Sequence, residues 1–120
     1  MREQIFRHGD MIIFKVKEIP SHLKAVKKKD KLVVGLGEVT GHSHDILPVD
    51  NGEITTFVEN ETVTENELAE MNSLFFEITE GAGIIVHEEH DPIQLGKGKY
   101  LRMRQVEFNP FTKQLENVRD

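Results

Sequence analysis

Hydrophobic and polar residues alternate with period two along most of this chain, which is typical of β-strands that bury one face. The alternation predicts strands near residues 12–17, 32–36, 54–58, 74–78 and 99–108. Ile84-Ile85-Val86 is a continuous apolar run, which predicts a strand buried on both faces. In the last strand the apolar positions change phase between Met103 and Val106, which indicates a bulge or a sharp bend.

The residues between these strands contain one hairpin signal and one helix signal. Asp50-Asn51-Gly52 lies between two expected strands and predicts a tight hairpin turn, because these residue types tolerate a positive φ. Thr64 and Glu67 have the spacing of a capping box and predict the start of one short helix. Leu68 and Met71 would form the buried side of that helix.

These elements predict an all-β fold, either a small single-domain barrel or a two-sheet sandwich, with one short helix. A barrel is favoured because closure protects the edges of short strands. The segment Lys24–Lys31, which holds five lysines, is expected to be a solvated connection. Residues 1–108 are expected to form a single β domain, followed by a C-terminal tail over residues 109–120.

The composition restricts the kinds of protein that remain. A length of 120 residues with 38 % hydrophobic residues supports one core. Cysteine is absent, which excludes disulfides, thiol nucleophiles and thiolate zinc sites. No apolar run approaches the roughly 20 residues of a membrane helix, and the first residues lack a signal-peptide pattern. We therefore expect a cytoplasmic protein that does not enter a membrane.

Charge is unevenly distributed along the chain. Residues 32–96 contain no lysine or arginine but 14 acidic residues, whereas all 15 basic residues lie before or after this span. Such a span repels the phosphates of nucleic acids and attracts cations. We therefore expect no binding to nucleic acid.

Four of the six histidines form two close pairs inside this acidic span. His42 and His44 are two residues apart, so on a strand both imidazoles can point to one side. His87 and His90 follow an apolar strand, where a turn before Pro92 can bring His90 back toward His87. Imidazole nitrogens bind zinc, nickel, iron and copper. The four histidines are therefore predicted to hold one divalent transition metal, with zinc as the first choice and nickel or iron as alternatives.

A catalytic use of such a site would need a general base. If three imidazoles bound the metal, a fourth position would remain for a water molecule that becomes a nucleophile near neutral pH. Glu88 and Glu89 are the candidate bases for a hydrolase-like reaction. Whether the protein is an enzyme stays open at this point. The spacing of His87 and His90 differs from the helical His-Glu-x-x-His protease motif, and the expected context is a strand.

The alternative is a non-enzymatic interaction or assembly module. In that case the histidines are structural, and the apolar residues Phe111 and Leu115 of the tail contact a protein partner or a second copy in a homo-oligomer. His8 and His22 lie outside both histidine clusters, in basic surroundings, and are interpreted as surface residues.

Several segments resemble a known group of proteins. They are residues 37–44 (Gly-Glu-Val-Thr-Gly-His-Ser-His), residues 87–93 (His-Glu-Glu-His-Asp-Pro-Ile), Gly98-x-Tyr100, residues 104–107 (Arg-Gln-Val-Glu), and the start, residues 8–13 (His-Gly-Asp-Met-Ile-Ile). With these motifs the chain resembles a family of small bacterial and phage proteins without an assigned activity. The resemblance implies that both histidine clusters belong to one shared site, and it brings no reaction or substrate.

Overall fold

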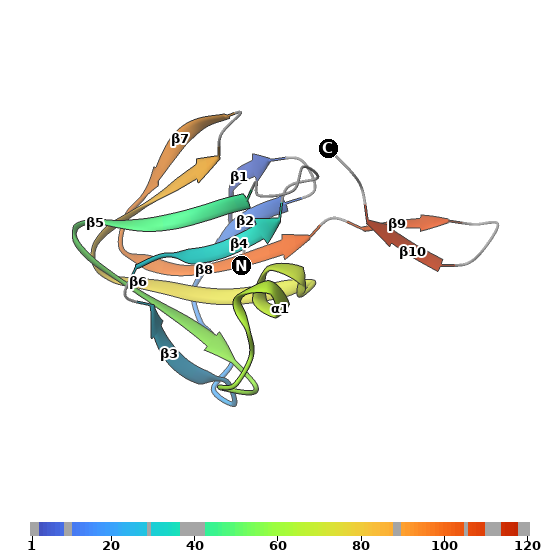
Figure 1. Ribbon diagram of the computed structural model, residues 1–120, viewed down its shortest axis with the longest axis horizontal. Coiled ribbons are helices and arrows are strands. Elements are labelled where there is room, and N and C mark those ends of the chain that lie inside the picture. Colours follow the sequence, from blue (N-terminus) through green and yellow to red (C-terminus); the bar gives the residue numbers. More distant parts are fainter. Residues whose placement is uncertain are drawn as a thin grey trace.

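The computed structural model describes residues 3–8, 11–28, 30–36, 43–87, 90–104, 106–109 and 114–117, with side chains for 11–28, 30–35, 44–86 and 91–104. The elements are β1 (Glu3–His8), β2 (Met11–Val16), β3 (Lys24–Lys28), β4 (Leu32–Leu36), β5 (Ser43–Val58), α1 (Glu65–Glu70), β6 (Ser73–His87), β7 (His90–Leu95), β8 (Gly98–Arg104), β9 (Val106–Asn109) and β10 (Gln114–Asn117). The fold is thus all-β with one short helix, as the alternation predicts (Figure 1). None of the described helices is long and apolar enough to span a membrane.

Eight strands form one antiparallel sheet around two long neighbours, β5 and β6. The strand order is β1-β2-β8-β6-β5-β3, while β4 pairs with the first half of β5 and β7 with the second half of β6. The β5–β6 pair therefore belongs to two layers. One layer contains β4 and β7, and the other contains β1, β2, β8 and β3.

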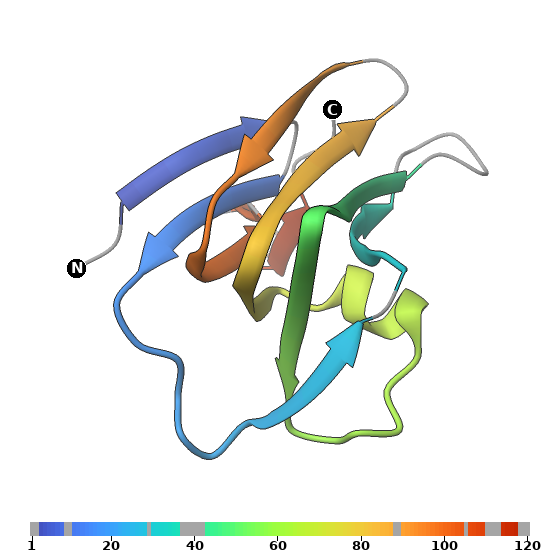
Figure 2. The same ribbon diagram turned by 90° about the vertical axis from the view of Figure 1, so that its left-hand side faces the viewer.

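The β5–β6 pair bends sharply where the two layers join (Figure 2). Between the pairs Val49↔Ala82 and Glu53↔Glu80, β5 has three residues and β6 has only Gly81. Asp50 and Asn51 have φ values of 54° and 60°, and Gly81 has 62°. A Cβ atom at Gly81 would collide with the carbonyl oxygen of Asp50, so glycine is required at this corner.

The bend corrects two expectations. Asp50-Asn51-Gly52 adopts the positive φ values of a turn, but the chain does not reverse there, because β5 stays paired with β6 on both sides. The prediction of a hairpin is therefore wrong, and the segment is a large bulge. The barrel is also wrong: among the described strands, β1 and β3 end the strand order, so the sheet is not closed. Bending one sheet over itself buries a core without closure.

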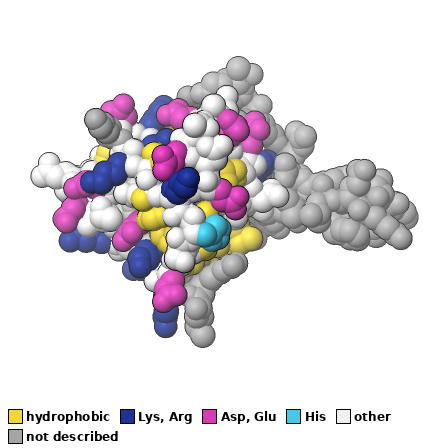
Figure 3. Space-filling view, turned by 90° about the horizontal axis from the view of Figure 1, so that it is seen from below, with side chains coloured by type: hydrophobic (Ala, Val, Ile, Leu, Met, Phe, Trp, Pro, Cys, Tyr) yellow, Lys and Arg dark blue, Asp and Glu magenta, His cyan; other side chains and the backbone are white. Residues whose placement is uncertain are grey.

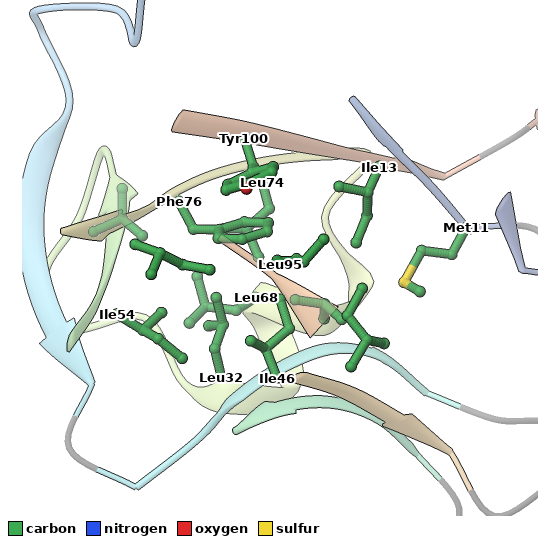
Figure 4. Packing of buried hydrophobic residues seen from close by; sticks show 14 residues of the cluster. Met11, Ile13, Leu32, Ile46, Ile54, Leu68, Leu74, Phe76, Leu95 and Tyr100 are labelled. Atoms are coloured by element: carbon green, nitrogen blue, oxygen red, sulfur yellow. The ribbon is translucent and has the colours of Figure 1, made fainter. Parts of the chain in front are cut away.

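The core lies between the two layers and is built by the inward positions of the strands (Figure 4). Leu74, Phe76 and Ile78 of β6 are all buried, as the alternation predicts. Tyr100 of β8 stacks on Phe76 with 5.2 Å between ring centroids, and its hydroxyl donates to the Gly96 carbonyl at 2.7 Å. Burial raises the pKa of the Tyr100 hydroxyl, so this group remains a hydrogen-bond donor.

Two strands differ in detail from the expectations. The segment expected as a solvated connection contains β3, which pairs with β5 from Lys24↔Val58 to Lys28↔Ile54. Only Val26 of this strand packs against the core, and lysines on an edge strand hinder pairing with other chains. In the apolar run near the end of β6, Ile85 is fully buried but Ile84 and Val86 are half-buried, so this strand buries only one face completely.

The short helix α1 confirms the capping-box prediction. The Glu67 N–H donates to the Thr64 hydroxyl at 3.1 Å, and the Thr64 N–H donates to the Glu67 carboxylate at 3.2 Å. Leu68 is buried in the core, and Met71 packs against it from the C-cap. Local sequence therefore determines where this helix begins.

Removing the Thr64 hydroxyl is expected to lower the free energy of unfolding by about 1 kcal/mol, because the capped N–H loses its acceptor. Thr64→Ala and Thr64→Ser should be compared by urea denaturation. The serine variant retains the oxygen and should stay close to the wild type. Equal losses in both variants would contradict a capping role.

Two arginines of β8 bind the other end of α1. The Arg102 guanidinium, which is completely buried, donates to the carbonyls of Met71 and, at 2.7 Å, of Leu68. The Arg104 guanidinium donates to the Glu70 carbonyl at 2.9 Å in a more exposed position. The last turn of the helix has no basic residue of its own, so β8 supplies the positive charge that favours a helix C-terminus.

The strand expected over residues 99–108 is divided. β8 ends at Arg104 and β9 begins at Val106, which agrees with the predicted change of phase. β9 pairs with β10, from Val106↔Asn117 to Asn109↔Gln114, in a separate two-stranded sheet that extends away from the other strands (Figure 1). The expected boundary between the β domain and the tail, at residue 108, therefore lies within β9 of this hairpin.

Candidate functional site

His44 is a buried histidine on the inner face of the sheet. It lies near the start of β5, where His44 and Ile46 are buried and the intervening Asp45 is half-buried. The side chain of His44 is only 1 % exposed. A polar ring in such surroundings has to make specific interactions, so His44 is not an ordinary surface histidine.

The strand register brings the second histidine cluster to the same place. Asp45 of β5 is paired with Val86 of β6. Because the two strands are antiparallel, one further step along each places the position of His87 opposite His44. Along its other edge β6 pairs with β7, and there His87 lies directly opposite His90. Positions opposite one another on neighbouring strands share a face of the sheet. Positions 44, 87 and 90 therefore form one row across three strands, although 43 residues separate the first two.

Two irregularities of the sheet flank this row. The pairing of β4 with β5 shifts between Val33 and Gly35, immediately before the pair Gly35↔His44. The pairing of β6 with β7 shifts between Ile85 and His87. Bulges are common next to functional sites, because they redirect a side chain without breaking the sheet.

Met11 and His44 both lie beside Gly35, a proximity that the sequence analysis did not identify. A Cβ atom at Gly35 would lie 3.3 Å from Cδ2 of His44 and 3.5 Å from Sδ of Met11. The imidazole and the thioether therefore share the space that the missing Cβ leaves open. Met11 is 1 % exposed and lies at one end of the core cluster, beyond Ile13 (Figure 4). The available signal was its position in the segment 8–13 of the resemblance.

The structure describes the side chains around the histidine row only in part. Asp45 forms an ion pair with Lys31, with 3.6 Å between Oδ2 and Nζ. His42, Glu88 and Glu89 lie outside the described residues, and His87 and His90 are described by their backbone. Within the part of the chain whose side chains are described, no three histidine, aspartate or glutamate side chains are grouped as a ligand set.

Folding reduces the charge segregation seen in the sequence. Lysines from the basic flanks lie beside carboxylates of the acidic span: Lys27 is 3.4 Å from Glu53 and Lys97 is 3.8 Å from Glu80. His22 is exposed and lies 3.8 Å from a Glu59 carboxylate oxygen, in agreement with its interpretation as a surface residue. Exposed pairs of this kind stabilise a fold little, by at most about 1 kcal/mol.

The outer face of the sheet carries an apolar row of its own. Directly opposed positions on β2, β8, β6 and β5 are occupied by Phe14, Leu101, Phe75 and Phe57. The connection 16–21 crosses this face and encloses with Phe75 and Leu101 a groove of about 600 Å³. A smaller hollow of about 240 Å³ lies beside it, near His22 and Phe57. Figure 3 shows hydrophobic side chains gathered on the face seen from below, with charged side chains around them.

The fold and the histidine row define an all-β domain, a single sheet bent into two layers, with its candidate site where β5, β6 and β7 run side by side. The chain belongs to the family described as a domain of unknown function, DUF8820, whose model matches residues 7–105. The matched segment includes both histidine clusters. No curated protein and no solved structure matches the chain.

Proposed function

We propose that this domain binds one transition-metal ion at the end of the sheet where β5, β6 and β7 meet. The ligands are the imidazoles of His42, His44, His87 and His90, and on the sequence alone zinc is the first choice of metal. The observation that carries the proposal is the single row of positions 44, 87 and 90 across three paired strands.

Three further features support this proposal. His44 is buried, so its ring is shielded from competition by water. The two register shifts directly precede the row, on both sides of the β5–β6 pair. The span 32–96 has no lysine or arginine, so no cation within it would oppose a metal ion.

Hydrolytic activity is a further proposal, which depends on the proposed metal site. If His42 or another ligand leaves one coordination position open, a metal-bound water there would have a pKa near 7. Glu88 or Glu89, which follow His87 in the sequence, would be the base that removes its proton.

The test is the metal content of the native protein. We expect about one equivalent of metal per chain after purification without a histidine tag, and a lower melting temperature after treatment with a chelator. Binding to the folded state alone stabilises it by roughly 3 kcal/mol at a hundredfold excess of free metal over Kd.

An interaction module that works without metal makes a different prediction. It would contain no stoichiometric metal after reconstitution with zinc, nickel, iron or copper, and its melting temperature would not respond to the chelator. That result would overturn the metal site and leave the outer apolar row as the surface for a partner.

A further inference from the structure

Met11 provides a soft ligand beside the histidine row. Its sulfur and the His44 ring both lie within 3.5 Å of the point where a Gly35 Cβ would stand. Both side chains are 1 % exposed. The thioether comes from β2, so a metal held by Met11 and the row would connect the two layers of the sheet.

We propose that Met11 is a ligand in this site and that the site selects copper(I). This inference rests on the metal site proposed above and names its metal. Thioether sulfur is a soft ligand that selects copper(I), whereas zinc sites use imidazole, thiolate and carboxylate. Imidazole accepts both metals, so Met11 is the residue that decides between them.

The charge of the surroundings favours the same metal. Imidazole and thioether are neutral ligands, so the full charge of the ion remains uncompensated by them. The cost of burying an ion grows with the square of its charge, so a monovalent ion is much less costly here than a divalent one. Asp45 is next to His44 in the sequence, but successive residues of a strand face opposite sides of the sheet. Its carboxylate forms an ion pair with Lys31.

Gly35 makes this arrangement possible. It lies on β4 directly opposite His44, and the lack of a side chain leaves room for both the ring and the thioether beside the strand. In Gly35→Ala the new methyl group would sit 3.3 Å from Cδ2 of His44, which is tighter than an ordinary contact. The ring would have to move by a few tenths of an ångström.

The experiment measures copper(I) and zinc(II) affinities by chelator competition, without oxygen for copper, in the wild type, Met11→Leu and Met103→Leu. Met103 is the matched control, because it lies on the strand next to β2 but opposite Ile12, which is on the other face from Met11. We expect Met11→Leu to weaken copper(I) binding about tenfold or more and to change zinc binding less than about threefold. Met103→Leu should change neither affinity.

X-ray absorption of bound copper gives a second readout. Because the chain has no cysteine, any sulfur bound to copper must come from methionine. The wild type should show a copper–sulfur contact that Met11→Leu lacks. Selenomethionine labelling of the wild type should convert it to copper–selenium, which requires no substitution that could disturb folding.

The possible failures are distinguishable. Copper bound by nitrogen and oxygen alone, or a copper–sulfur contact that persists in Met11→Leu, would overturn the role of Met11 and leave the histidine site intact. Equal losses of copper and zinc affinity in Met11→Leu would show that Met11 acts by packing, and would also overturn it. A wild type that binds neither metal would overturn both this inference and the proposed function.

Discussion

Replacing either His44 or His87 by alanine is expected to abolish stoichiometric metal binding, although the two residues come from separate sequence clusters. The reason is the register: one residue beyond the pair Asp45↔Val86, the two positions lie opposite one another on β5 and β6, so in the proposed site each would supply one ligand to the same ion. Loss of one ligand should lower the affinity by more than about a hundredfold, because even groups that only orient a ligand contribute 10–100-fold. Isothermal titration with zinc and with copper measures the effect.

The control for this prediction is His22→Ala. His22 is exposed, lies near Glu59 and belongs to neither cluster, so this variant should bind metal like the wild type. Since His44 is buried, its replacement also leaves a cavity, and the metal-free melting temperature of each variant must be recorded. If His44→Ala and His87→Ala both keep the metal content and affinity of the wild type, the shared site is wrong.

The second large effect is expected at Arg102. In Arg102→Met the carbonyls of Leu68 and Met71 both lose their guanidinium donor, and the Leu68 carbonyl keeps only the longer bond from the Met71 N–H at 3.3 Å. A hydrogen bond to a charged group contributes about 1.5–3 kcal/mol, so the loss of both corresponds to a loss of about 3 kcal/mol in the free energy of unfolding. For a chain of this size we expect the melting temperature to fall by roughly 12 °C.

Arg104→Met is the matched control for Arg102→Met. Arg104 lies two residues further along the same strand and also donates to a helix carbonyl, that of Glu70, but in an exposed position. Water can replace this donor, so the expected loss is below about 1 kcal/mol. Denaturant unfolding of both variants tests the comparison. Similar losses in the two variants would show that burial of the Arg102 guanidinium does not stabilise the fold as argued.

The helix start and much of the core follow from local sequence. The capping box of Thr64 and Glu67 was predictable because its hydrogen bonds join residues three apart in the chain. The buried positions Leu74, Phe76 and Ile78 follow from strict alternation, since a strand with one buried face repeats every two residues. The phase change before Val106 likewise predicted the break between β8 and β9.

The predictions that were wrong concern features that depend on which strands become neighbours. Asp50-Asn51-Gly52 can form a hairpin turn or a bulge with the same φ values, and only the continued pairing with β6 selects the bulge. The lysine-rich β3 became a strand because the second half of β5 offered it an edge. Arg102 is polar and gave no core signal, yet the carbonyl end of α1 supplies its buried acceptors.

The same distinction applies to the candidate site. The sequence by itself determined an all-β chain with one capped helix, no cysteine, and two histidine pairs inside a span without lysine or arginine. Residue spacing cannot tell whether segments far apart in the chain become neighbours, because that depends on strand order and register. Only the tertiary structure decided that positions 44, 87 and 90 share one row, and that the Met11 thioether and the His44 ring both lie beside Gly35. The physical reason is that hydrogen bonds between strands, and the bend that folds the sheet onto its core, are made by residues distant in sequence.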